Sequence, residues 1–76
     1  MTDSPTFVCR FGDGQITRMT IHTRLDKLDV GRGVRLARHA YRSRVRRAPP
    51  PIVEAHFERE GARLASYDAE ALKKSA

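Results

Sequence analysis

The chain has 76 residues, 39% of them hydrophobic and 32% charged, and a formal net charge of +6. These proportions are typical of one small folded domain, 1–76, and exclude a disordered chain. No apolar run is long enough to span a bilayer, and residues 1–6 lack the pattern of a signal peptide, so we expect a cytoplasmic protein with no membrane partner. The single cysteine, Cys9, cannot form an intramolecular disulfide, and homodimerisation would be one way to bury more apolar surface.

The N-terminal part of the chain predicts a frayed start, 1–5, followed by a hairpin. In residues 6–11 the side chains of Phe7, Cys9 and Phe11 alternate onto one face, as in a strand. Asp13-Gly14, within the turn 12–15, is a strong hairpin signal because both residues tolerate positive φ. Residues 16–23 predict the returning strand. One of its faces would carry Thr17, Met19, Ile21 and Thr23, and the other Ile16, Arg18, Thr20 and His22.

A helix is predicted next, in a segment that is rich in arginine. Either Thr23 with Asp26, or Asp29 alone, would cap its start. We expect a loose or short helical lead-in and a firm helix from about Gly33 to Arg46, because each glycine costs about 1 kcal/mol relative to alanine. At about 100° per residue the apolar side chains form one stripe, Val30, Val34, Ala37, Ala40, Tyr41 and Val45. The opposite arc is basic and consists of Arg32, Arg35, Arg38, His39, Arg42 and Arg46, while Leu36, Arg44 and Arg47 fall on the margins.

The second half of the chain predicts another hairpin and another helix. Ala48 and prolines 49–51 end the long helix and form a stiff spacer, 48–51, between the halves. Residues 52–58 predict a third strand, with Val53, Ala55 and Phe57 inward. A two-residue turn at Glu60-Gly61 would place Phe57 opposite Leu64 and Glu58 opposite Arg63. The expected fourth strand is 62–67, and Asp68 would cap a short helix from Ala69 to about Lys74 with Leu72 facing inward.

The order of elements, ββαββα, indicates an α+β fold. We expect a four-stranded antiparallel sheet, one Arg-rich amphipathic helix packed across one face, and a short C-terminal helix.

The charge of the chain is concentrated in the long helix. Between Val30 and Arg47 there are seven arginines and no acid, whereas the remaining eight basic and nine acidic residues nearly cancel. One interpretation is a solvated face whose arginines pair with acids elsewhere, such as Glu54, Glu58 or Glu60. The other is a surface for an anionic partner. We favour the second, because the helix contains no acid at i+4 to relieve repulsion between its own arginines. The predicted contact residues are Arg32, Arg35, Arg38, His39, Arg42, Arg46 and Arg47.

Other residues with possible chemistry form no recognisable site. Cys9, His22, His39 and His56 lack the short spacing of structural zinc ligands, so we expect no metal. The glycines around Arg32 lack a longer phosphate-binding fingerprint, and we interpret them as a close packing of the helix start against a strand. No nucleophile stands beside a base in a known motif, so we expect no enzyme and no cofactor.

The lack of certain residue types reduces the number of partner classes to consider. There is no tryptophan, and Tyr41 lies on the apolar stripe, so stacking on single-stranded bases is not favoured. We expect duplex nucleic acid, contacted mainly through phosphates. The alternative is an inhibitor of the kind made by phages and mobile elements, such as anti-CRISPR proteins, binding a host protein or nucleoprotein through the same basic surface. A third hypothesis is a subunit of a larger assembly.

Overall fold

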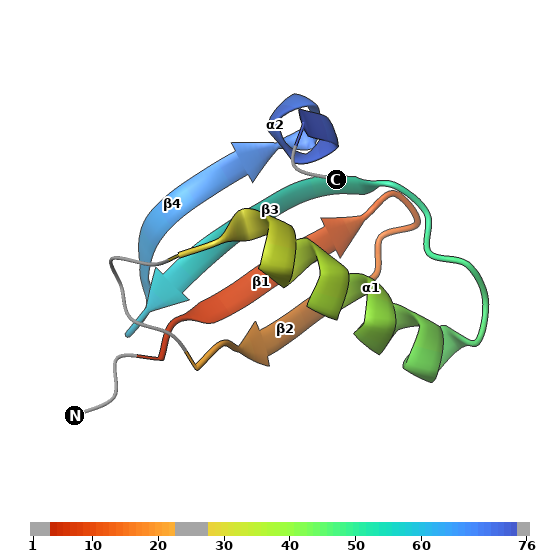
Figure 1. The fold of residues 1–76 in the computed structure, drawn as a ribbon, viewed down its shortest axis with the longest axis horizontal. Coiled ribbons are helices and arrows are strands. Elements are labelled where there is room, and N and C mark those ends of the chain that lie inside the picture. The colour runs from red at the N-terminus through yellow and green to blue at the C-terminus, as the bar shows by residue number, and fades with distance from the viewer. Residues whose placement is uncertain (1–3, 23–27, 75–76) are drawn as a thin grey trace.

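The fold consists of one antiparallel sheet with a long helix packed across it. The computed structural model describes residues 4–22 and 28–74. Its elements are β1 (Thr6–Phe11), β2 (Ile16–Thr20), α1 (Val30–Val45), β3 (Ile52–Arg59), β4 (Ala62–Asp68) and α2 (Ala69–Lys74). The strand order is β2-β1-β3-β4, and every neighbouring pair is antiparallel. α1 crosses one face of the sheet and α2 follows directly on β4, so the predicted fold is confirmed (Figure 1).

The core lies between the sheet and α1. The rings of Phe7 and Phe57 meet with centroids 4.9 Å apart, and those of Phe11 and Tyr41 meet at 4.7 Å. All four side chains are essentially inaccessible to solvent. Because Tyr41 comes from the apolar stripe of α1, this packing fixes which side of the helix remains at the surface.

The first strand of the first hairpin has the predicted bounds, whereas its second strand ends sooner than the sequence pattern predicts. Pro5 is buried, and its carbonyl accepts a hydrogen bond of 2.9 Å from the amide of Ile21, so this part of the expected frayed start is ordered. β2 ends at Thr20 because its partner β1 begins opposite, at Thr6. Ile21 beyond the end of β2 is buried, as is Thr17, so the face that these two residues share is the inward one. The expectations for Thr23, as a strand residue and as a cap, lie outside the described residues.

α1 starts at Val30, three residues before the predicted firm helix. Asp29 caps it, with its carboxylate accepting a hydrogen bond of 3.0 Å from the amide of Gly31. A Cβ added to Gly33 would lie 3.0 Å from ring atoms of Phe7, so the glycine permits the helix to approach the sheet closely. Of the two expected forms of the lead-in, the loose one is wrong and the helical one is present, because packing against β1 compensates for the low helix propensity of glycine. At the other end Arg46 adopts a left-handed conformation with φ 61° and caps the helix.

The predicted facing of residues in β3 and β4 is wrong at two places, because the strand pairing is irregular at each of them. Between β1 and β3 the register shifts, so Ile52 pairs with Phe11 and is buried, while Val53 is exposed instead of inward. Between β3 and β4 a second shift places Ala65, not Leu64, opposite Phe57. A bulge inserts one residue into one strand and reverses the facing of the residues beyond it.

The rest of the second half follows the prediction. Glu58 pairs with Arg63, and both turn residues, Glu60 and Gly61, have positive φ. Asp68 caps α2 through a hydrogen bond of 2.9 Å from the amide of Ala71, and Leu72 is buried. α2 thus joins the same core as α1.

Candidate nucleic-acid interface

The basic arc of α1 lies at the surface. All six predicted members of the arc, Arg32, Arg35, Arg38, His39, Arg42 and Arg46, are exposed. The opposite stripe is buried at Val34, Ala37 and Tyr41 and half-buried at its remaining members. The predicted division of the helix into two faces is therefore confirmed. We call these six residues the arginine face.

The acids of the sheet are engaged elsewhere. Glu54 pairs with Arg10 at 3.3 Å, and Glu58 pairs with Arg18 at 3.2 Å. These residues alternate with the core side chains along their strands, so their side chains project from the sheet surface that α1 does not cover. Across residues 4–22 and 28–74, no arginine of the arginine face forms an ion pair with a described acid. The structure therefore does not support the interpretation in which Glu54, Glu58 or Glu60 neutralises the arginine face.

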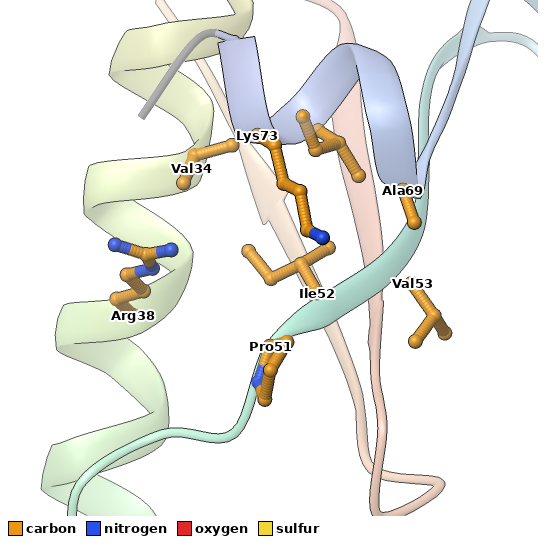
Figure 2. Close-up of a pocket in the computed structure, with 8 residues that line it drawn as sticks. Val34, Arg38, Pro51, Ile52, Val53, Ala69 and Lys73 are labelled. Carbon is orange, nitrogen blue, oxygen red and sulfur yellow. The ribbon is translucent and has the colours of Figure 1, made fainter.

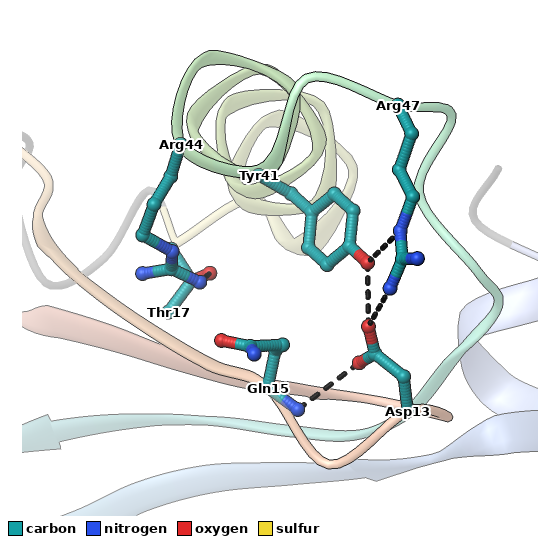
Figure 3. Close-up of polar contacts among 6 residues, drawn as sticks. All are labelled: Asp13, Gln15, Thr17, Tyr41, Arg44 and Arg47. Atoms are coloured by element: carbon teal, nitrogen blue, oxygen red, sulfur yellow. Dashed lines mark hydrogen bonds and ion pairs between the residues drawn. The ribbon is translucent and has the colours of Figure 1, made fainter.

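The two basic residues at the margin turn toward the sheet instead. Arg47, just beyond the helix, donates from Nε to the hydroxyl of Tyr41 at 3.3 Å and lies 3.4 Å from the carboxylate of Asp13. Tyr41 donates its own hydroxyl proton to Asp13, as Figure 3 shows. Arg44 donates to the hydroxyl of Thr17 at 3.4 Å. The predicted contact residue Arg47 is thus tied to a structural cluster, which we call the Asp13 cluster (Asp13, Tyr41 and Arg47).

The Asp13 cluster holds the tip of the first hairpin against the C-terminal end of α1. The pKa of Asp13 is lowered, chiefly by the hydrogen bond from the Tyr41 hydroxyl and then by that from the amide of Gln15, with Arg47 contributing further. A lowered pKa in the folded state stabilises the fold above the ordinary carboxyl pKa, and this contribution is lost as the pH falls through the folded value. The Asp13 cluster therefore stabilises the fold at neutral pH, where the carboxyl group of Asp13 is ionised.

Replacing Tyr41 by phenylalanine is expected to cost about 1 kcal/mol at pH 7, because the hydroxyl loses its part-buried hydrogen bonds to Asp13 and from Arg47 while the ring packing stays. The pKa of Asp13 should rise in the variant, so the stability difference from the wild type should shrink as the pH falls below the ordinary carboxyl pKa and through the lowered value of the wild type. Urea denaturation at several pH values measures both effects. Equal stability of the two proteins at pH 7 would show that the contact contributes nothing.

The cysteine and the histidines lie in different parts of the structure. Cys9 is buried in the core, and burial raises the pKa of its thiol to about 12, although Arg38 acts in the opposite direction. Such a thiol stays protonated and is a poor nucleophile. His56 lies 3.1 Å from Glu58 on the sheet, whereas His39 is on the arginine face. In the described part of the chain, no group of three or more His, Cys, Asp or Glu side chains is arranged to hold a metal ion.

The aromatic side chains are occupied by the core. Phe7, Phe11, Phe57 and Tyr41 are buried, and Tyr67 is half-buried with its ring edge-on to Phe57 at 6.1 Å. These are all the aromatic residues of the chain. The arginine face therefore offers no Phe, Tyr or Trp ring on which an unpaired base would stack, and its one aromatic ring is the imidazole of His39.

One basic residue near the arginine face belongs to a different helix, so the periodicity of α1 does not indicate it. Lys73 of α2 lines the same surface hollow as Arg38 and Arg42 of α1. Its neighbour Leu72 is directed into the core, and this anchors the short helix beside α1. Periodicity within one helix does not indicate which second element will lie beside it, so Lys73 could not be predicted from the sequence as part of this surface.

In residues 4–22 and 28–74, no helix has the length and apolar character needed to cross a membrane. Comparison with protein-family models, with curated proteins and with solved structures finds no match to this chain.

Proposed function

We propose that the protein is a non-enzymatic binding protein that docks the arginine face of α1 on duplex nucleic acid, mainly through phosphate contacts. The observation that supports this most directly is the exposure of five arginines on one side of one helix, none paired with a described acid. Like charges held together in this way repel one another, and an anionic partner relieves the repulsion.

The dimensions of α1 suit a duplex. A helix of 16 residues is about 24 Å long, and Arg32 and Arg42 lie about 15 Å apart along its axis. A surface helix of this kind fits the major groove, where arginines on successive turns reach phosphates. α1 contains no asparagine or glutamine, the side chains that read adenine, so we expect weak sequence discrimination.

The buried aromatic residues favour a duplex over a single strand. Proteins that bind single strands without sequence preference combine basic grooves with exposed rings. Here the rings belong to the core, so phosphate contacts must supply the affinity, and a duplex presents phosphates at higher density.

Titration of a mixed-sequence DNA duplex with the protein at increasing salt tests this proposal. Five arginines that each release counterions predict a slope of log K against log salt of about −4 to −5. We expect a Kd near the micromolar range in dilute salt, and weaker binding to the corresponding single strand. Fluorescence anisotropy measures both. Failure to bind duplex even in dilute salt, together with recovery of a stable protein partner, would contradict the proposal and favour an inhibitor acting through the same surface.

A further inference from the structure

A groove runs between the C-terminal half of α1, the proline segment 49–51 and α2. Its wider part has a volume of about 410 Å³ and is lined by Arg38, Arg42, the prolines and Lys73. A smaller hollow of about 180 Å³ adjoins it and shares Arg38, Pro51 and Lys73. Figure 2 shows Arg38 on α1 and Lys73 on α2 on either side of this hollow, with Pro51 and Ile52 between them. The groove therefore has basic walls that come from two different helices.

The charges of the groove are all of one sign. Arg38 and Arg42 are one helical turn apart, and Lys73 is on the opposite wall. No acid is among the described residues that line either hollow. None of the three cations forms an ion pair with a described acid. A groove with this electrostatic character attracts a chain of anions.

The remaining wall is apolar and rigid. Proline has no amide donor and a fixed φ, so prolines 49–51 offer ring surface to a ligand and lose little freedom when it binds. Pro51 is also fixed in place, because its carbonyl accepts a hydrogen bond of 2.9 Å from the amide of Gly12. A sugar–phosphate strand matches such a groove, since its phosphates meet the cations while its sugar carbons pack against the proline rings.

We propose that one strand of the bound duplex runs along this groove and that Lys73 contacts one of its phosphates. The inference rests on the proposed function and extends it, because it adds α2 as a second arm of the phosphate site. It also orients the complex: the contacted strand lies on the α2 side of α1.

Replacing Lys73 by glutamine tests the groove, with Arg63→Gln as the matched control. Both variants lose one positive charge at an exposed side chain. Arg63 pairs with Glu58 in the β-ladder, so its side chain is directed to the sheet surface opposite α1. Affinity for the same duplex is measured by anisotropy at several salt concentrations, and thermal denaturation checks that both variants are folded.

For Lys73→Gln we expect a salt slope reduced in magnitude by about 0.9 and an affinity lowered about 3- to 10-fold in dilute salt. For Arg63→Gln we expect an unchanged slope and less than a twofold loss. Equal behaviour of the two variants would overturn the groove proposal while leaving binding through α1 intact. Absence of duplex binding by the wild type would overturn both proposals.

Discussion

Replacing Arg38 and Arg42 together by glutamate is expected to lower the affinity for duplex DNA at least about a thousand-fold. Each arginine supplies a charge-assisted contact worth about 1.5–3 kcal/mol, and a thousand-fold loss corresponds to about 4 kcal/mol. The two glutamates would also repel the phosphates from the centre of the arginine face. Starting from micromolar binding, this loss brings the Kd beyond the range that anisotropy detects.

Two comparisons separate loss of contact from loss of structure. Both arginines are exposed and have no ion-pair partner among the described acids, so the double variant should unfold at nearly the same temperature as the wild type. The variant with lysine at both positions keeps the charge and should retain binding within about tenfold, because a phosphate also accepts a point charge. The single change Arg42→Glu should weaken binding far more than Arg63→Glu. An unfolded double variant would show that these side chains are structural, and full binding by a folded one would refute the proposed interface.

The arginine face could be predicted because its pattern lies within one element. The helical period alone decides which side chains share a face, and the apolar stripe around Tyr41 decides which face is inward. Asp29 as the cap was one of two alternatives that local chemistry allowed. The hairpin turns were predicted from Asp13-Gly14 and Glu60-Gly61, and of these four residues Gly14, Glu60 and Gly61 have positive φ.

The features that escaped prediction depend on contacts between elements. The bulges expose Val53 and Leu64 because packing, not alternation, sets the register of β3. Close packing of the helix start against a strand was predicted from its glycines and is confirmed by Gly33 and Phe7, but the early start of the regular helix was not predicted, because no propensity scale contains this contact. Lys73 reaches the groove for the same kind of reason. A pattern along the chain identifies faces, and the fold decides which faces meet.

Phe57 of β3 is the position at which we expect a substitution to have the largest effect on stability. Replacing Phe57 by alanine is expected to cost about 3–5 kcal/mol, because this buried ring contacts both Phe7 and Tyr67 and its removal leaves a cavity. A domain of 76 residues has a total stability of about 4–11 kcal/mol. The melting temperature should therefore fall by about 15–30 °C. If the total stability of the wild type is about 4 kcal/mol, the variant would be unfolded at 37 °C.

The control for Phe57 is Leu64, which simple alternation would place directly opposite it. The structure instead places Ala65 there and leaves Leu64 about 43% exposed. Leu64→Ala should therefore cost less than about 1 kcal/mol, since little apolar surface leaves a packed environment. Urea denaturation of the two variants measures the difference. A cost for Leu64→Ala close to that for Phe57→Ala would mean that the strand pairs without a bulge. In that case Leu64 would belong to the core against which α1 packs, and the position of the arginine face relative to the sheet would have to be derived again.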